Sequence, residues 1–266
     1  MPFTEVDGAR IHYLDAGPSG APALVLLHAF PLHAGMWTPQ IEHLSSTHRV
    51  VAPDLLGFGG SDAPESMYRY TMLGFADVVA GLLDHLGLER VVLGGLSMGG
   101  YVAFAFLRQY PERVRGLILA DTRAGADTTM VFDRRTDQQD QVARIGTTAL
   151  IETLLAGLLS EETRAHRLEL VEQVRRLMAN PPAGFIGGLE AMKHRPDATE
   201  ELGSITVPVL VIVGEEDSPS PPDVAREMER RIPDAELVVL PSAGHLSNLE
   251  AADEFNAAVA SFLARL

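Results

Sequence analysis

The 266-residue sequence predicts an α/β fold, with a mostly parallel sheet covered by helices on both faces and a helical insertion. Short, nearly all-apolar runs alternate with segments of helical spacing over residues 22–121. Residues 123–202 then carry helical patterns with no convincing strand, and runs typical of strands return from residue 207. Because the sheet needs strands from both sides, we predict one α/β core, residues 1–122 and 203–266, interrupted by the helical insertion 123–202.

Composition narrows the class of partner. Hydrophobic residues make up 46% and charged residues 21%, as in ordinary globular proteins. The net charge of −15 disfavours nucleic acid and anionic membrane surfaces. Cysteine is absent, which excludes disulfides, thiolate chemistry and cysteine metal sites. The beginning of the chain lacks the pattern of a secretory signal, and no apolar run approaches the roughly 20 residues of a membrane helix. We therefore expect a soluble cytoplasmic protein with no membrane partner.

The first elements follow from local patterns. Apolar and polar residues alternate around Asp7-Gly8, which predicts an opening hairpin. The run PALVLLH ends at His28 and is typical of a strand buried on both faces. The segment MWTPQIEHLS favours a helix with Thr38 as N-cap and a proline at its first position.

A second strand and helix follow. The segment HRVVAPDLLGFGGSD predicts a strand that runs into a glycine-rich loop. That loop lacks the Lys-Ser/Thr ending of a phosphate loop, so we interpret it as a tight turn. The segment TMLGFADVVAGLLDHLG has apolar residues at helical spacing and ends at Gly87.

One serine stands between a strand and a helix. The run VVL before it predicts a short buried strand, and the residues after it favour a helix. The sequence Gly95-Leu96-Ser97-Met98-Gly99 between them is a G-x-S-x-G nucleophile elbow. Such a turn predicts a positive φ at Ser97 and crowding that only glycines tolerate at 95 and 99. The N–H of Met98 opens the helix without an intrahelical partner, so we expect it to face a developing oxyanion.

A serine hydroxyl needs a base, and His245 is the strongest candidate. It lies in PSAGHLSNLE, just past the last predicted strand, at the edge of the sheet where the elbow also projects. Ser247 and Glu250 there match a capping box that starts the final helix. The other histidines considered lie in the opening hairpin, beside helices or in the insertion: His12, His43, His48, His85, His166 and His194.

The base needs an orienting acid, and three carboxylates are candidates. In this type of elbow the chain order is serine, acid, histidine. Asp217 follows a strand in LVIVGEED and is the first choice. Glu216 is its nearest rival, and Asp121, after the preceding strand, is a second rival.

The loop HAFPL after the first parallel strand is expected to supply a second oxyanion donor. The N–H of Phe30 is the best candidate, because Pro31 has none to give. We interpret His28 as a residue that orders this loop and takes no part in catalysis.

Together these residues resemble the α/β-hydrolase superfamily. The segments LLHAFPL…MW, VVAPDLLGFGGSD, GGLSMGG, VPVLVIVGEED and GHLSNLE occur in the order of that family over nearly the whole chain. Within it, the chain is similar to small bacterial carboxylesterases, enol-lactonases and cofactor-free perhydrolases, to which the Phe30-Pro31 pair points. The resemblance implies that residues 123–202 form a cap domain. Dehalogenases and epoxide hydrolases of the family have an aspartate in place of Ser97.

One position departs from the family pattern. The family usually has His-Gly where this chain has His28-Ala29. If the second position needs a positive φ, alanine is strained there by about 1 kcal/mol.

We therefore expect a carboxylic ester hydrolase that acts on a small-molecule ester or related acyl substrate, with no cofactor and no metal. In this mechanism Ser97 attacks, His245 held by Asp217 takes the proton, and Phe30 and Met98 hold the oxyanion. An enol-lactonase, a perhydrolase or a carbon–carbon bond hydrolase would use the same residues, and a non-catalytic small-molecule receptor is a further alternative. Candidates for the substrate pocket have a spacing that is also typical of a cap core: Met130, Phe132, Leu154, Leu158, Phe185 and Leu189.

Overall fold

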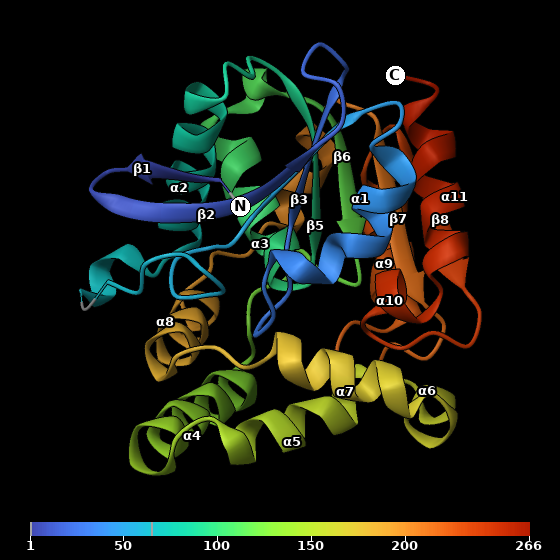
Figure 1. Ribbon diagram of the computed structural model, residues 1–266. Helices are drawn as coiled ribbons and strands as arrows, with labels where there is room; N and C mark the ends of the chain where they lie inside the picture. Colours follow the sequence, from blue (N-terminus) through green and yellow to red (C-terminus); the bar gives the residue numbers. More distant parts are fainter. Residues whose placement is uncertain (1, 65) are drawn as a thin grey trace.

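A computed structural model describes residues 2–64 and 66–266. Within these residues, eight strands form one sheet in the order β1-β2-β4-β3-β5-β6-β7-β8 (Figure 1). Strand β1 pairs antiparallel with β2, β2 pairs antiparallel with β4, and all other pairs are parallel. The predicted α/β class is confirmed. The strands are β1 (Phe3–Val6), β2 (Ala9–Ala16), β3 (Ala23–Leu27), β4 (Arg49–Pro53), β5 (Val91–Leu96), β6 (Val114–Ala120), β7 (Val209–Gly214) and β8 (Ala235–Leu240).

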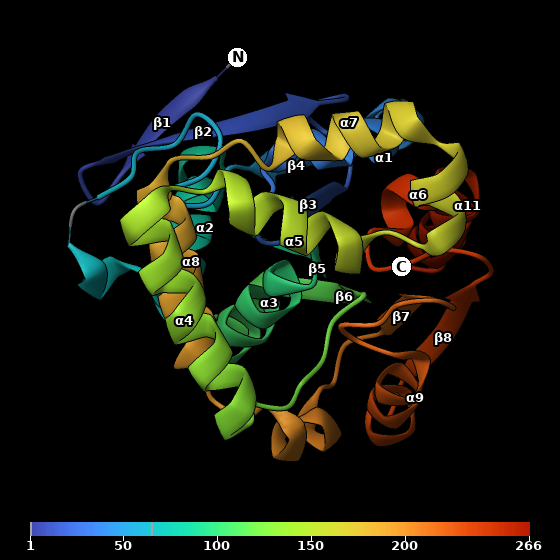
Figure 2. The ribbon, with the colours of Figure 1, turned by 90° about the horizontal axis from the view of Figure 1, so that it is seen from below.

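Helices cover both faces of the sheet (Figure 2). Helices α1 (Thr38–Leu44) and α11 (Ala252–Leu263) lie on one face. Helices α2 (Met72–His85), α3 (Met98–Gln109) and α9 (Pro222–Arg231) lie on the other. Strands β3, β5 and β7 are consequently buried at every residue, which explains why each is almost entirely apolar.

The segment between β6 and β7 is helical, as predicted. Its helices lie below the edge of the sheet toward which the carboxyl ends of the parallel strands point (Figure 1). They are α4 (Thr129–Ile145), α5 (Thr148–Leu158), α6 (Glu161–His166), α7 (Leu168–Leu177) and α8 (Pro182–Lys193). Short helices complete the chain: η1 (Ala34–Trp37), η2 (Met67–Arg69), η3 (Pro111–Arg113), η4 (Thr199–Ser204) and α10 (Ser247–Glu250).

The start of α1 differs from the prediction. Thr38 is not an N-cap, because the preceding residues already form the 3-10 helix η1. The hydroxyl of Thr38 instead donates back to the carbonyl of Gly35 at 2.9 Å. The cap of this combined unit is His33, whose side chain accepts a hydrogen bond from the N–H of Gly35.

The glycine-rich loop after β4 is a tight turn built around one buried carboxylate. Asp54 accepts the N–H groups of Ala34 at 2.7 Å and Gly60 at 2.8 Å. It also lies 2.7 Å from Nδ1 of His12 in β2. Gly59 has a φ of +54°, and a β-carbon there would collide with the Asp54 side chain. Through Asp54 the loop is thus bonded to β2 and to the segment at Ala34, and the bond to Gly60 closes the turn itself.

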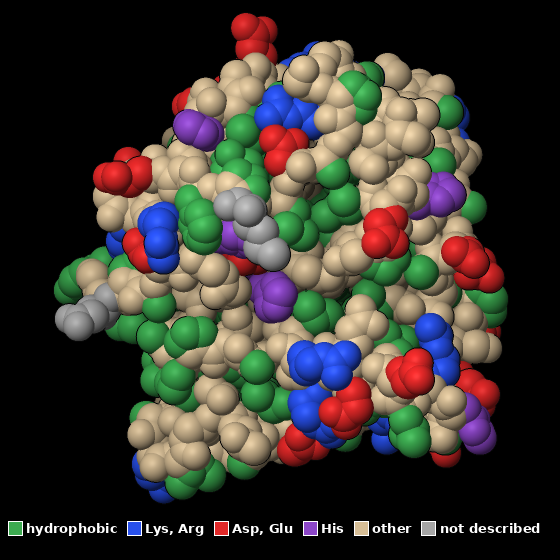
Figure 3. Space-filling model, viewed as in Figure 1, with side chains coloured by type: hydrophobic (Ala, Val, Ile, Leu, Met, Phe, Trp, Pro, Cys, Tyr) green, Lys and Arg blue, Asp and Glu red, His purple; other side chains and the backbone are tan. Residues whose placement is uncertain are grey.

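The chain has a net charge of −15. On the face shown in Figure 3, acidic and basic side chains are interspersed. None of the helices in residues 2–64 and 66–266 has both the length and the apolar character that a membrane crossing needs.

Candidate active site

The elbow has the predicted backbone. Ser97 joins β5 directly to α3 with a φ of 55° and a ψ of −113°, a conformation that is costly for a residue with a side chain. Hydrogen bonds hold it in place. The Ser97 N–H donates to the carbonyl of Ala120 in β6 at 3.0 Å, and the Thr122 hydroxyl donates to the Ser97 carbonyl at 2.8 Å.

Gly95 and Gly99 are each required by a different close contact. A β-carbon at Gly95 would collide with the carbonyl of Gly99, which confirms the predicted crowding across the elbow. A β-carbon at Gly99 would collide with the carbonyl of Leu27 in the neighbouring strand β3. The second glycine therefore allows the start of α3 to approach the sheet closely.

Three side chains from distant parts of the chain form a hydrogen-bonded series. Oγ of Ser97 lies 2.8 Å from Nε2 of His245. Nδ1 of His245 lies 2.9 Å from both carboxylate oxygens of Asp217. A carboxylate only accepts, so Nδ1 carries the hydrogen and Nε2 is left to accept from the serine hydroxyl. Asp217 is itself fixed by the N–H of Ser220, which donates to its Oδ1 at 2.8 Å.

The two rival acids do not bond to the imidazole. Glu216 is exposed. Asp121 is fully buried, but its oxygens accept from the hydroxyl of Ser247 at 2.5 Å and the N–H of Gly214 at 2.9 Å. Burial, together with the nearby charge of Asp217, raises the pKa of Asp121 well above its ordinary value. Of the three carboxylates considered, Asp217 is the one that contacts the imidazole.

The predicted capping box at Ser247 and Glu250 is wrong. Leu246 occupies the N-cap position of α10 and makes no side-chain cap. The hydroxyl of Ser247 serves Asp121, and Glu250 accepts the N–H groups of Gly244 at 2.9 Å and Ser160 at 2.8 Å. The two side chains therefore bond to buried groups outside α10, whereas the capping-box pattern considers only the residues at one helix end.

The loop that carries His245 is attached to the helical segment. The N–H of His245 donates to the carbonyl of Leu158, the last residue of α5, at 3.0 Å. Glu250 adds the bridge between Gly244 and Ser160 described above. The end of α5 therefore helps to hold the imidazole, a relation that the sequence analysis missed.

Two backbone amides are available at the serine. Phe30 follows β3 and lines the same cavity as Ser97, and Met98 is the first residue of α3. Neither N–H donates to any partner within the described part of the chain. Ala29 is not among the residues with positive φ, so the strain considered for the His-Ala pair does not arise.

His28 orders the loop, as interpreted from the sequence. Its Nδ1 donates to the carbonyl of Ala29 at 3.0 Å, and its Nε2 accepts from the N–H of Leu55 at 3.0 Å. Complete burial lowers the pKa of His28 to about 4. Both ring nitrogens are thus occupied in the neutral form, which leaves none for catalysis.

A cavity of about 390 Å³ opens onto Ser97 and His245. The core contributes Phe30 and Tyr101, and the helical segment contributes Leu154 and Leu158, two of the six predicted pocket residues. Arg123, Arg134 and Arg135 also line it, and sequence reasoning missed them. The charged pair at 134 and 135 is visible in the sequence, but nothing in it shows which way that helix faces. The remaining lining residues are Val131, Gln138, Thr153, Gly157, Met192, Ser218, Pro219 and Ser220.

The other four predicted pocket residues do not line this cavity. Phe185 and Leu189 are completely buried, and the ring of Phe185 packs edge-on against that of Phe30. Phe132 packs against the ring of His194, and Met130 is 78% exposed. Helical spacing correctly indicated buried positions at 185 and 189, but α8 buries them against the core.

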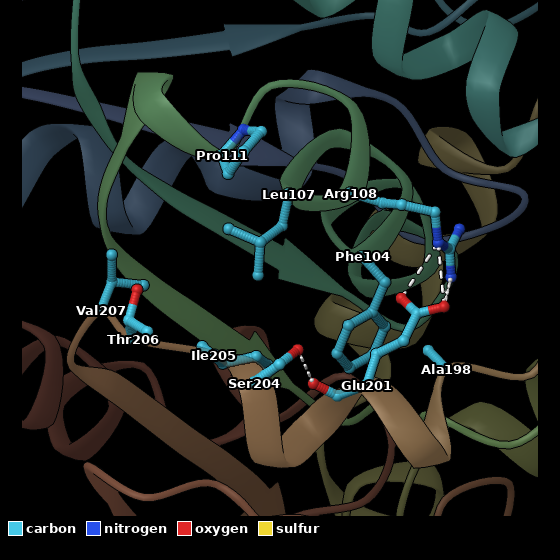
Figure 4. Close-up of a pocket in the computed structure, with 10 residues that line it drawn as sticks. All are labelled: Phe104, Leu107, Arg108, Pro111, Ala198, Glu201, Ser204, Ile205, Thr206 and Val207. Atoms are coloured by element: carbon cyan, nitrogen blue, oxygen red, sulfur yellow. Dashed lines mark hydrogen bonds and ion pairs between the residues drawn. The ribbon is translucent and has the colours of Figure 1, made fainter.

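A second hollow, of about 320 Å³, lies between α3 and η4 (Figure 4). Arg108 and Glu201 form an ion pair across it at 2.8 Å, and the Ser204 hydroxyl donates to the carbonyl of Glu201 at 2.7 Å. Neither Ser97 nor His245 lines it. In the described residues, no group of three or more histidine, aspartate or glutamate side chains is arranged to hold a metal ion.

The sheet, the elbow and the hydrogen-bonded series define a class of protein. The family model for the alpha/beta hydrolase fold matches residues 22–252, and the chain belongs to this family.

Individual relatives include several hydrolases. A thermophilic esterase from Thermogutta terrifontis, in a malate-bound structure, is 39% identical with a TM-score of 0.92, over 99% of this chain and 96% of that one. The enol-lactonase from Burkholderia xenovorans LB400 is 30% identical with a TM-score of 0.92, over 99% and 100%. The 2-hydroxy-6-oxononadienedioate/2-hydroxy-6-oxononatrienedioate hydrolase of Burkholderia vietnamiensis is 33% identical, over 96% of this chain and 91% of its own length.

Proposed function

We propose that the protein is a serine hydrolase that cleaves carboxylic esters of small molecules through an acyl-enzyme. The observation that carries the proposal is the series Ser97–His245–Asp217, with contacts of 2.8 and 2.9 Å, at the wall of a cavity. A serine hydroxyl is a weak nucleophile until a base within hydrogen-bond reach accepts its proton. Nε2 of His245 has that position, and Asp217 holds the ring in the tautomer that the reaction needs.

The reaction has two halves. Oγ of Ser97 attacks the acyl carbon while its proton passes to Nε2 of His245. The imidazolium then protonates the departing alkoxide, the carbon–oxygen bond of the ester breaks, and the acyl group stays on Ser97. In the second half His245 takes a proton from water, the hydroxide attacks the acyl carbon, and the proton returns to Oγ of Ser97 as the carboxylic acid leaves.

The N–H groups of Phe30 and Met98 are the proposed oxyanion donors. Both amides lack a partner in the part of the chain that the structure describes, and Met98 stands at the N-terminus of α3, where the helix dipole favours negative charge. Loss of one such donor typically costs about 10²–10³ in turnover. We also propose that residues 123–202 act as the cap over the site, because α4 and α5 supply one wall of the cavity.

An enol-lactonase is the second candidate. The Burkholderia xenovorans enol-lactonase covers the whole fold of this chain with a TM-score of 0.92. A lactone is a cyclic ester, so the same atoms of Ser97 and His245 would open its ring, and the alcohol would stay attached to the acid. The similarity to the hydrolase of Burkholderia vietnamiensis adds cleavage of a carbon–carbon bond as a third activity to include in the test.

Labelling with a fluorophosphonate tests the nucleophile. Mass spectrometry of the labelled protein is expected to place one adduct on Ser97 and none in Ser97→Ala. The control is Ser218→Ala, which removes another hydroxyl from the same cavity and is expected to leave labelling intact. Labelling elsewhere, or none, would refute the proposal.

A substrate panel then identifies the reaction. Nitrophenyl esters, lactones and vinylogous diketones are offered to the wild type and to Ser97→Ala. Turnover of the esters, abolished in the variant, supports the ester hydrolase, and faster turnover of the lactones favours the enol-lactonase. Tight binding of a ligand without any turnover would instead indicate a receptor.

A further inference from the structure

Among the described residues, three arginines line the cavity beside Ser97, and no acidic residue does. This is a local reversal of charge in a chain whose net charge is −15. Arg123 comes from the loop after β6, and Arg134 and Arg135 come from α4. The uncharged nucleophile Ser97 and a wall of positively charged side chains therefore line the same cavity.

These arginines are incompletely neutralised. The acidic partner of Arg123 and Arg135 is Asp127, whose carboxylate also pairs with Arg195 at 2.6 Å. Nε of Arg135 lies 2.6 Å from the Asp127 carboxylate, whereas Nη2 of Arg123 lies 3.7 Å from it. Within residues 2–64 and 66–266, the side chain of Arg134 makes no hydrogen bond and no ion pair.

One atom of this cationic wall is buried without a partner. The Nε of Arg123 is inaccessible to solvent and donates to no group in the described chain, although its side chain as a whole is 26% exposed. A buried donor without an acceptor costs free energy, and native proteins satisfy nearly all of them. A ligand in the cavity can reach only the exposed part of this side chain, and a planar carboxylate matches a guanidinium there because its two oxygens accept two parallel N–H groups.

We propose that the substrate carries a carboxylate, which Arg123 and Arg134 bind while Ser97 attacks an ester carbonyl a few bonds away. This inference rests on the proposed hydrolase function and names the substrate class within it. The arginines are specificity residues: they select and orient the substrate, and the bond-breaking steps stay with Ser97, His245 and Asp217.

Matched pairs of esters test the proposal on the acyl side. The p-nitrophenyl hemiester of glutarate carries a carboxylate, and p-nitrophenyl 4-carbamoylbutanoate replaces it by a neutral amide of the same shape. We expect kcat/KM of the wild type to favour the carboxylate by about 10- to 100-fold, the range for charged hydrogen bonds. The pair 4-acetoxybenzoate and 4-acetoxybenzamide makes the same comparison on the alcohol side. We expect the preference for the carboxylate in one of the two pairs, and we expect it to weaken with added salt.

Variants connect the preference to the arginines. Arg123→Gln and Arg134→Gln are each expected to reduce the carboxylate-to-amide ratio of kcat/KM, and the double variant to bring it close to one. The Arg134 side chain has no hydrogen bond or ion pair to lose within the described residues, so its variant is informative even if Arg123→Gln does not fold. The control is Arg144→Gln, an exposed arginine on the same helix α4 that does not line the cavity, which is expected to leave the ratio unchanged.

Binding separates this proposal from the proposed function. Calorimetry of glutarate with Ser97→Ala measures the cationic site without turnover, and binding is expected to weaken in Ser97→Ala/Arg134→Gln. Sulfate at equal ionic strength is expected to bind more weakly than glutarate. A ratio near one in both ester pairs, or equal binding of sulfate and glutarate, overturns the carboxylate proposal while fluorophosphonate labelling of Ser97 stands. Absent labelling with retained glutarate binding overturns the proposed function alone.

Discussion

Two buried aspartates lie at the imidazole end of the site, and they differ in what they contact. Asp217 accepts from Nδ1 of His245, and Asp121 accepts from Ser247 and Gly214. The desolvation of Asp121 and its proximity to the Asp217 charge favour the protonated form, which cannot stabilise an imidazolium by its charge. The proposed mechanism therefore assigns the two carboxylates unequal roles.

This inequality predicts the kinetics of two isosteric variants. Asp217→Asn is expected to lower kcat/KM for a nitrophenyl ester by about 10³–10⁴, because the amide no longer fixes the reactive tautomer. Asp121→Asn is expected to stay within a few-fold of the wild type, since its oxygen still accepts from Gly214 and its amide donates to Ser247. Initial rates of the two variants measure the difference. A loss in Asp121→Asn as large as that in Asp217→Asn would contradict the assignment.

The residues that meet at the site were predictable to different degrees. Ser97 and His245 stand where local patterns place them, at a glycine-flanked turn and just past the last strand. Asp217 is the first choice from the sequence, but two rivals stay beside it because the choice depends on how the loops after β6 and β7 curl. In the structure Asp217, and not Asp121, turns toward the ring. The cavity wall was the least predictable. Phe185 has the spacing of a buried residue, yet burial alone does not say which surface a side chain faces.

At the scale of an element, the junction of β5 and α3 concentrates strain and close packing in a few residues. The positive φ of Ser97 is held by the hydrogen bonds from Ser97 to Ala120 and from Thr122 to Ser97. Gly99 lets the first turn of α3 lie against the backbone of β3. The unpartnered amide of Met98 lies next to Gly99 in this turn, so packing and proposed chemistry meet in neighbouring residues.

We predict that Gly99→Ala destabilises the protein by at least 2 kcal/mol, within the range for overpacking a core. The added methyl group would meet the backbone carbonyl of Leu27, which cannot rotate away as a side chain does. Gly157→Ala is the matched control. It lies within α5 with nothing within 4 Å of the new β-carbon, and alanine there is expected to stabilise by about 0.5–1 kcal/mol. Urea unfolding of both variants measures the contrast, and equal effects would contradict this account of the junction.

At the scale of the whole molecule, one buried carboxylate joins distant parts of the segment between β6 and β7, and its network reaches the core. Asp127, whose side chain is 1% exposed, pairs with Arg135 of α4 and with Arg195 after α8, both at 2.6 Å. Burial alone would raise the pKa of Asp127, but the hydrogen bonds and charges of Arg135 and Arg195 hold it below its ordinary value. The ring of Tyr101 on α3 lies 4.1 Å below the guanidinium of Arg195, so the network ends on the core.

Asp127→Asn is expected to lower the free energy of unfolding by about 3 kcal/mol at pH 7, because it leaves buried guanidinium groups without a counter-charge. A carboxylate with a depressed folded-state pKa stabilises above its unfolded pKa of about 3.9, and this contribution is lost as the pH falls through the folded value. Urea midpoints of the wild type and the variant should therefore differ by a constant amount from pH 7 to about pH 4 and begin to approach each other only below about pH 4. Asp223→Asn removes an exposed ion pair to Arg226 and is expected to cost less than about 0.5 kcal/mol at any pH. If the two variants were equally stable at pH 7, the buried network would not be what fastens the helices over the active site.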